Sequence, residues 1–526
     1  MNIKNYLSFA TFVTLLLTLT QCNAYKILAA FVFPARSHYM MHTVLIKELL
    51  NRGHEVTFIT TMPMGKNLGK HYTEVLIPTY NYQKDVIGLF NIKTIFELTT
   101  LTLKDFFRMM DLLGTRTTEF ALQQPNVQEI LHRNDTKNVY DLLIVEQFYQ
   151  EAFLALALKY DIPTISSSTL GQQTFMSEMM GVITPWSYVP HGSLALDDRM
   201  TFWERVQNSV ASLYDGFFRE FIYFPHQDEL VQKYFSHLPM KLPTVSEMKK
   251  NVSVLLLNSY TPLTSPRPTN MGMVEVGGMH IYPPKSLPAE IKAFLDGATH
   301  GAIYFSLGSQ VKSSDLPKQK LKIFLDVFAK MKQRILWKFE DDSLSNLPKN
   351  VMIKKWMPQG DILAHPNIKV FITHGGLFGN QEGVHYGVPM LGLPVCCDQY
   401  LNMNKAAKAG YAITLDFNEI SRENLEYSLT ELLEKPSYRN KMNQISEIFR
   451  DRPLSARDSA MYWIEYVGRH KGARHIRSAG LDLAWYQYYL LDVIGLFTLA
   501  VVGVVAAILL LLKKVLGTKK SKDKIN

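Results

Sequence analysis

Two histidines stand where this chain could do chemistry, because each directly follows a short apolar run with the length of a β-strand. His38 comes after residues 25–33 (YKILAAFVF), and His374 comes after residues 370–373 (VFIT). A neutral imidazole can accept a proton near neutral pH. Two glycines follow His374, and glycines that open a helix expose backbone N–H groups at the positive end of its dipole, which suits a phosphate. The sequence therefore predicts a general base at His38 and an anion site at His374.

The segment around His38 has the pattern of a β–α–β unit. Apolar residues recur at helical spacing until Gly53 ends the helix, and residues 55–60 (EVTFIT) form the next strand. Such a unit implies a parallel sheet whose functional residues lie at the carboxyl ends of its strands. Ser37 is the predicted N-cap of the helix. The nearby positive helix end disfavours the cationic form of His38, so we expect a neutral, proton-accepting imidazole.

Residues 371–399 (FITHGGLFGNQEGVHYGVPMLGLPVCCDQ) combine a strand, a glycine-rich turn, a helix-capable segment and a second apolar strand. Throughout its length this stretch resembles the signature of the UDP-glycosyltransferases. The matching positions are Phe371, Ile372, Thr373, His374, Gly376, Gly379, Glu382, Pro389, Pro394, Asp398 and Gln399.

The resemblance implies a role for each polar position of this stretch. His374 and the glycines would hold a diphosphate, and Glu382 would bind the ribose hydroxyls. Asp398 and Gln399 would read the hydroxyls of the sugar, because a carboxylate and an amide together can accept from and donate to vicinal hydroxyls. Phe378 departs from the family pattern, since many relatives carry a polar residue there that faces the phosphates.

Two further turns resemble donor-binding turns of the same family. Gly308 and Ser309 follow the strand 302–307, where the family places the diphosphate. Residues 356–359 match its tryptophan-x-proline-glutamine turn. There Trp356 would stack on uracil and Gln359 would reach toward the ribose. Lys338 stands where some relatives keep arginine and could serve as a point charge for phosphate.

The histidine base needs an orienting carboxylate that also steadies the imidazolium as it forms. Family resemblance places the acceptor-deprotonating histidine at His38 and an aspartate at the end of a strand in the middle of the first domain. Here that strand is 140–145 (YDLLIV), and Glu146 occupies the matching position. Glu151, five residues later, is the rival candidate. An ordinary strand-end charge is the alternative interpretation of Glu146.

Metal and cofactor chemistry is not indicated by the sequence. No Asp-x-Asp triplet occurs, and no His/Cys cluster has metal-ligand spacing. We therefore expect metal-independent transfer without a cofactor, in which helix dipole, backbone amides and His374 stabilise the departing UDP. The lysine-rich tail supplies much of the formal net charge of +9, so a nucleic-acid partner is not indicated either.

The two ends of the chain predict a membrane-anchored protein of a secretory compartment. Residues 1–24 have the pattern of a signal peptide. Residues 493–512 form an uncharged run long enough to cross a hydrocarbon core, with lysines beyond it that favour a cytosolic tail. The terminal lysines 522 and 524 resemble a dilysine retrieval signal. The sequons at Asn134 and Asn251 would be usable on the lumenal side. The predicted location is the endoplasmic reticulum membrane, single-pass type I, with a lumenal catalytic part.

The expected fold class is α/β: two facing Rossmann-like domains, the GT-B arrangement, plus one C-terminal transmembrane helix. The first domain would bind mainly the acceptor, through apolar residues within 86–122 and 170–240, and the second the donor. The predicted divisions are 1–24 (signal peptide), 25–280 (acceptor domain), 281–450 (UDP-sugar domain), 451–489 (juxtamembrane helices), 490–512 (transmembrane helix) and 513–526 (cytosolic tail).

The resemblance implies inverting transfer of a hexose from a UDP-sugar to a hydroxyl of a small lipophilic acceptor, as in detoxification or in hormone or pigment conjugation. Residues 451–489 resemble the juxtamembrane region of insect members, which favours UDP-glucose as donor. UDP-glucuronate stays open as the donor. A donor-binding protein without transferase activity is the alternative class, motivated by the departures at Glu146 and Phe378. Homo- or hetero-oligomers stay open as well.

Overall fold

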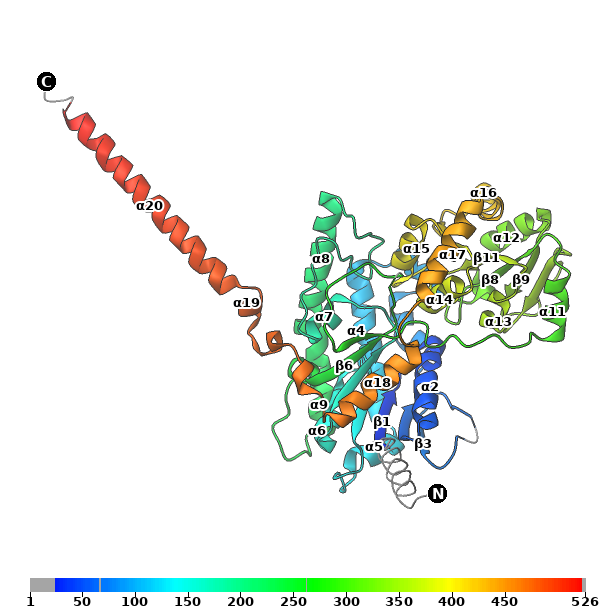
Figure 1. The fold of residues 1–526 in the computed structure, drawn as a ribbon, viewed down its shortest axis with the longest axis horizontal. Helices are drawn as coiled ribbons and strands as arrows, with labels where there is room; N and C mark the ends of the chain where they lie inside the picture. The colour runs from blue at the N-terminus through cyan, green and yellow to red at the C-terminus, as the bar shows by residue number, and fades with distance from the viewer. Residues whose placement is uncertain (1–23, 66–67, 262, 523–526) are drawn as a thin grey trace, which may run out of the picture. The chain divides into compact units, whose positions relative to one another are not determined.

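The structure is a computed structural model that describes residues 24–65, 68–261 and 263–522 (Figure 1). The chain divides into two compact units, one that ends at Ile476 and one that begins at Arg477. Residues 1–23 of the predicted leader and residues 523–526 of the predicted retrieval signal lie outside the described residues.

The first unit contains two all-parallel sheets, and within the described residues the first of them has seven strands in the order β3-β2-β1-β4-β5-β6-β7. Most of these strands are nearly continuous buried runs, as expected of parallel strands covered on both faces. The strand order reverses between β1 and β4, so ligands are expected at the carboxyl ends of these two strands. The strands are β1 (Lys26–Phe31), β2 (Glu55–Thr60), β3 (Tyr72–Leu76), β4 (Leu142–Glu146), β5 (Thr164–Ser168), β6 (Val252–Leu257) and β7 (Met273–Glu275).

Helices connect these strands and cover the sheet. The longer ones are α2 (Arg36–Asn51), α4 (Leu103–Leu122), α5 (Pro125–His132), α8 (Phe202–Phe218) and α9 (Phe224–Phe235). The shorter ones are α3 (Tyr82–Asp85), η1 (Ile87–Phe90), η2 (Ile95–Thr100), η3 (Glu151–Leu154), α6 (Ala155–Tyr160), α7 (Thr174–Met179), α10 (Val245–Met248) and η5 (Lys249–Asn251). A π-helical turn, η4 (Arg219–Tyr223), joins α8 directly to α9.

The second sheet repeats this plan with the order β10-β9-β8-β11-β12-β13, which reverses between β8 and β11. Its strands are β8 (Ala302–Ser306), β9 (Arg334–Lys338), β10 (Val351–Lys354), β11 (Ile368–Thr373), β12 (Met390–Gly392) and β13 (Ala412–Thr414). Its helical elements are α11 (Ala289–Asp296), η6 (Ser313–Asp315), α12 (Lys318–Lys330), α13 (Gln359–Leu363), α14 (Leu377–His385), α15 (Gln399–Lys408), α16 (Arg422–Glu434) and α17 (Pro436–Arg450).

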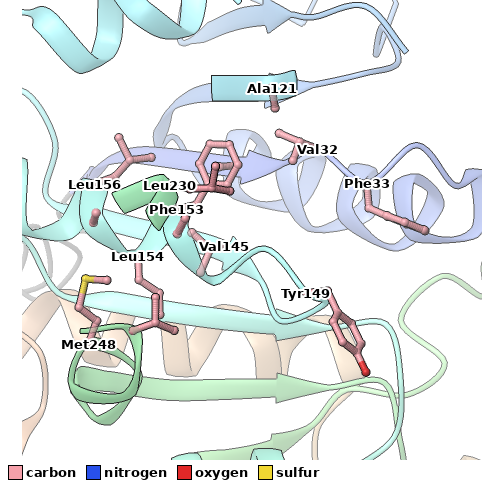
Figure 2. Packing of buried hydrophobic residues seen from close by; sticks show 14 of the residues in the cluster. Val32, Phe33, Ala121, Val145, Tyr149, Phe153, Leu154, Leu156, Leu230 and Met248 are labelled. Carbon is pink, nitrogen blue, oxygen red and sulfur yellow. The ribbon is translucent and has the colours of Figure 1, made fainter. Parts of the chain in front are cut away.

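Each sheet has an apolar core on both faces, and Figure 2 shows part of the core beneath the first sheet, with Phe33 and Tyr149 toward one end of it. The part of this unit that contains the first sheet is called the first half, and the part that contains the second sheet is called the second half. After α17 the chain returns to the first half. Helix α18 (Ala456–Arg469) buries Ala460, Met461 and Ile464 in the same core as the strands of the first sheet. A short turn, η7 (Arg474–Ile476), ends the unit.

The two halves of this unit are joined through the buried side chain of Gln381 on α14. Its Nε2 donates to the carbonyl of Asn258 at 3.0 Å, and its Oε1 accepts from the amide of Gly278 at 2.9 Å. Both partners lie in the segments that follow strands of the first sheet. Because Gln381 is fully buried, these two hydrogen bonds lie in the interior of the interface between the two halves.

One local prediction was wrong. Ser37 was predicted as the N-cap, but α2 begins at Arg36 and its N-cap is Ala35, which makes no side-chain capping bond. His38 therefore lies inside the first helical turn. The wider division into six segments stays a prediction.

The second unit contains η8 (Ala479–Asp482), α19 (Trp485–Tyr488) and α20 (Leu491–Lys522). Within α20, Leu491–Lys514 is long and apolar enough to cross a membrane. The predicted C-terminal apolar helix is thereby confirmed, and it fits a single-pass membrane anchor.

Candidate functional site

His38 and Glu146 meet at the carboxyl ends of β1 and β4, where the first sheet reverses its strand order. The Nδ1 atom of His38 is hydrogen-bonded to Oε1 of Glu146. His38 is 9% exposed and Glu146 is 2% exposed, so the pair is shielded from most solvent. A carboxylate at Nδ1 keeps the proton on that nitrogen and leaves Nε2 as the acceptor.

The charge state of Glu146 follows from two opposed effects. Burial by itself raises the pKa of this carboxyl, whereas the neighbouring His38 and His42 and the hydrogen bonds from His38 and Thr169 lower it. The net result is a pKa below the ordinary value, because the favourable contacts outweigh the loss of hydration. Glu146 is thus ionised near neutral pH and can offset positive charge on His38.

Thr169 is a member of this group that the sequence reasoning missed. Its hydroxyl lies 3.1 Å from Nδ1 of His38 and 3.4 Å from Oε1 of Glu146. Thr169 directly follows β5, the strand that neighbours β4. Its place after a strand is the only sequence signal that could have found it, and β5 itself (TISSS) has no apolar run.

Two aromatic rings pack against the His38 imidazole. The ring centroids of Phe33 and Phe148 lie 4.8 and 4.6 Å from that of His38. Tyr82 packs beyond Phe33, and its hydroxyl donates to Oε1 of Gln310 in the second half at 2.8 Å. The base candidate therefore faces an apolar environment, as a lipophilic acceptor would require.

Glu151 lies in a separate buried cluster and makes no described contact with His38. Its Oε1 accepts from Gln147 at 2.8 Å, and its Oε2 accepts from the hydroxyl of Tyr223. Burial raises the pKa of Glu151, against the lowering effects of Tyr223 and Arg219. Between the two candidates, Glu146 is the carboxylate that contacts the imidazole.

His374 lies between two glycines at the carboxyl ends of β8 and β11, the switch point of the second sheet. A Cβ atom at Gly308 would lie 2.6 Å from Cε1 of His374, and one at Gly376 would collide with Nε2. Gly308 also has a φ of +81°, which only glycine adopts without strain. The two glycines thus let the backbone close around the ring.

Among the residues that the structure describes, the buried Nδ1 atom of His374 has no hydrogen-bond partner. Burial lowers the pKa of His374 to about 4, and the charge of Lys338 adds to this effect. Lys338 donates to the carbonyl of Gly308 at 2.9 Å and to Glu340 at 2.5 Å. An unpartnered nitrogen beside the N-terminus of α14 suits a hydrogen bond to a phosphate oxygen.

Trp356, Gln359 and Glu382 form the next part of the second-half site. Trp356 is 63% exposed, an unusual position for a large indole that a stacking partner would explain. Gln359 donates through Nε2 to Oε2 of Glu382 at 2.5 Å. Burial raises the pKa of Glu382 to about 7, which the bond from Gln359 only partly opposes. Gly379 lies against the Gln359 amide, where a Cβ would come within 3.4 Å of Nε2.

Asp398 and Gln399 begin α15 and are held by different partners. Asp398 accepts from Nδ2 of Asn402 at 3.0 Å, and burial raises its pKa. Gln399 uses Oε1 to accept from the amides of Val395 and Cys396 at 2.9 and 3.1 Å. Asn402 was missed by the sequence reasoning. Its amide also donates to the carbonyl of Gly375 at 3.1 Å and so ties Asp398 to the His374 turn.

The two halves of the site are within electrostatic reach of each other. Burial is the largest influence on the pKa of Asp398 and raises it, while the bond from Asn402 and the neighbouring His38 are among the influences that lower it. Phe378, the residue that departs from the family pattern, makes no described contact with the polar residues of the site. Its ring packs on that of His280, with centroids 4.8 Å apart, and against the core of the first half.

The remaining predicted residues lie at the surface. Ser309 is exposed beside Gly308, and the sequon residues Asn134 and Asn251 are both exposed. Among residues 24–65, 68–261 and 263–522, no group of three or more His, Cys, Asp or Glu side chains could hold a metal ion.

Comparison with known proteins relates the whole chain to enzymes that use nucleotide sugars. Residues 28–522 match the family model "UDP-glucoronosyl and UDP-glucosyl transferase". The chain is 36% identical to UDP-glucosyltransferase 2 of Dactylopius coccus over 475 residues, which covers 90% of this chain and 89% of that protein. It is 32% identical to human UDP-glucuronosyltransferase 2B7 over 512 residues, 94% of each chain.

Solved structures share the fold at low sequence identity. The glycosyltransferase VinC in complex with dTDP aligns with a TM-score of 0.59 and 15% identity, over 85% of this chain and all of that one. The calicheamicin glycosyltransferase CalG4 aligns with a TM-score of 0.57 and 16% identity, over 85% and 99%. The predicted α/β fold of GT-B type is confirmed by these neighbours and by the two parallel sheets.

Proposed function

The chain belongs to the UDP-glucuronosyl and UDP-glucosyl transferase family, and from this we propose that it transfers a hexose, with inversion, from UDP-glucose to a hydroxyl of a small lipophilic acceptor. Family membership supports a UDP-sugar donor and a small acceptor. The observation that carries the mechanism is the buried His38–Glu146 pair at the point where the first sheet reverses its strand order.

In the proposed reaction His38 acts as the general base. Its Nε2 takes the proton of the acceptor hydroxyl while the hydroxyl oxygen forms a bond to the anomeric carbon of the sugar. The bond from that carbon to the UDP oxygen breaks on the opposite face, so the configuration inverts. Glu146 offsets the charge of the imidazolium, and the rings of Phe33 and Phe148 exclude water from the proton transfer.

The second half is assigned to donor binding and leaving-group stabilisation. The unpartnered Nδ1 of His374 and the amides that open α14 suit the diphosphate. Trp356 would stack on the uracil, Gln359 and Glu382 would bind the ribose, and Asp398 with Gln399 would read the sugar hydroxyls. Gly308, Ser309, Gly376 and Gly379 would supply close backbone approach. No metal ion or cofactor is needed for these steps.

A neutral hexose fits the charges around the site better than a glucuronate. Lys338, the cation beside the His374 turn, is half-buried and is already engaged by Glu340. A sugar carboxylate would therefore add a second negative charge near Asp398. The similarity to an insect UDP-glucosyltransferase supports the same donor.

A donor panel tests this proposal. Microsomes that contain the full chain should convert a phenol with UDP-glucose at least about tenfold faster than with UDP-glucuronate, a difference of roughly 1.4 kcal/mol in transition-state binding. Excess EDTA should not change the rate. Faster transfer from UDP-glucuronate would contradict the donor assignment, and UDP binding without any glycoside would favour the donor-binding class.

The affinity for UDP-glucose should fall as the pH is lowered through neutrality. The carboxylate form of Glu382 accepts from the ribose hydroxyls, and burial raises the pKa of Glu382 to about 7. Affinity should therefore weaken about tenfold between about pH 8 and about pH 6, measured by calorimetry. Both phosphates of UDP-glucose are esterified, so the ligand itself does not titrate there. Glu382→Gln should give weaker affinity without this slope, and an unchanged slope would assign it to another group.

The apolar helix α20 supports a single membrane anchor for the proposed enzyme. We place the catalytic unit in the lumen of the endoplasmic reticulum, on the basis of the predicted leader and the lysine-rich end of the chain. The exposed sequon residues Asn134 and Asn251 are compatible with glycosylation on that side.

A further inference from the structure

The turn after β4 carries an unusual residue next to the His38–Glu146 pair. Tyr149 is buried, yet its backbone has a φ of +56°, in the left-handed region that bulky side chains rarely adopt. Such a conformation is strained and persists only where the surroundings enforce it. The neighbouring Phe148 is the residue whose ring lies edge-on to the His38 imidazole, with centroids 4.6 Å apart.

Arg219 of the π-helical turn η4 holds Tyr149 from one side. Its Nη2 donates to the Tyr149 hydroxyl at 2.8 Å, and its guanidinium lies 4.5 Å above the Tyr149 ring. Asp215 accepts from Nε of Arg219 at 2.8 Å, and the ring of Phe175 covers the guanidinium at 3.6 Å. Arg219 is 4% exposed, so these contacts form in a desolvated environment where they are strong.

Helix α4 closes on Tyr149 from the other side. A Cβ atom at Gly114 would collide with Cβ and the carbonyl oxygen of Tyr149, so only glycine allows this approach. Thr118 donates to the same carbonyl at 3.5 Å. The turn is therefore held by two separate helical segments, η4 and α4.

We propose that Arg219 and Tyr149 are positioning residues, which fix the turn after β4 so that Phe148 presses the His38 imidazole onto Glu146 and aims Nε2 at the acceptor hydroxyl. This inference rests on the proposed function of His38 as the base. It assigns a task to a buried charged cluster that the transfer mechanism does not otherwise use. A displacement of about 1 Å from a distant change can reduce a rate by up to about a hundredfold.

The test replaces Tyr149 by phenylalanine in the full chain, which removes the hydroxyl bonded to Arg219 and keeps the ring. At saturating UDP-glucose, kcat/KM for phenol should fall about tenfold or more. For 4-nitrophenol, a much stronger acid that depends less on the base, the loss should be clearly smaller. The affinity for UDP-glucose should not change. Tyr160→Phe is the matched control, because it removes another buried hydroxyl, bonded to the carbonyl of Ile130 at 2.8 Å. It should leave both rates unchanged.

Each outcome decides between the positioning role and a structural one. Equal losses with both phenols, or no loss with either, would overturn the positioning role while the proposed function stands. Phe148→Leu removes the ring that contacts His38 and leaves the Arg219 cluster intact, so it should reproduce the unequal losses even if Tyr149→Phe unfolds the chain. A wild-type chain without transfer would overturn the proposed function first, and this inference with it.

Discussion

Replacing His38 by alanine should lower kcat by about 10²–10⁴-fold, the range expected when a general base is removed. The affinity for UDP-glucose should stay unchanged, because His38 lies in the first half and the proposed donor contacts lie in the second. The measurement is the rate of glucoside formation at saturating acceptor, together with calorimetric binding of UDP-glucose to the same preparation.

His42 provides a matched control for this substitution. It lies one turn further along α2, is 1% exposed and stacks on the ring of Phe31 with centroids 3.7 Å apart. Burial lowers the pKa of His42 to about 4, so it is neutral near neutral pH, and neither ring nitrogen has a hydrogen-bond partner within the described part of the chain. His42→Leu should affect stability more than transfer. If His38→Ala kept the wild-type kcat, the base would have to be assigned to another residue.

Replacing Glu146 by glutamine should lower kcat by about 10²–10⁴-fold, although the change is nearly isosteric. The amide of glutamine can hydrogen-bond to Nδ1 of His38 whether or not that nitrogen carries the proton, so it does not fix the tautomer. It also carries no charge, so it does not offset the positive charge of the imidazolium. Glu146→Asp, which restores the residue type expected from the family, should recover part of the rate. The same assay with phenol and UDP-glucose measures both variants.

Glu151→Gln distinguishes the two candidate carboxylates. Glu151 is equally buried and accepts from Gln147 and Tyr223, so its replacement makes the same chemical change away from His38. A much smaller loss of kcat than in Glu146→Gln is expected. A larger loss would make Glu151 the partner of the base and would leave the short contact between His38 and Glu146 without a catalytic role.

The parts of the fold that could be predicted are those in which local sequence decides structure. The strand over residues 55–60 forms at the predicted bounds, because its apolar residues lie between turn residues. Helix α16 begins at Arg422, with Ser421 as its N-cap, a capping signal that is visible in the sequence. Here the capping side chain and the apolar spacing agree with each other.

Strand β5 shows where this reasoning fails. Its sequence TISSS contains three serines that are fully buried at the centre of the first sheet, so its burial depends on neighbouring strands and not on its own apolar content. Without β5 there was no reason to place Thr169 beside His38. Asn402 was missed for a similar reason, since its contact with the Gly375 carbonyl joins two turns that only the folded sheet brings together.

Helix α18 illustrates a second limit. Its apolar spacing predicts a helix, but the surface it packs against comes from α2, β6 and β7, which lie far from it in the sequence. Periodicity describes one face of a helix and does not identify its partner. The same holds for Gln381, whose two bonds across the halves have no signal in the surrounding sequence.

The return of the chain through α18 has a mechanical consequence. Ile476, the last residue of the first unit, packs against the core of the first sheet, so the chain that continues to α20 starts from the half that contains β1 to β7. In the proposed membrane-anchored enzyme, a hinge motion between the two sheets would therefore move the half that contains β8 to β13, while the half that contains β1 to β7 would stay fixed relative to the anchor.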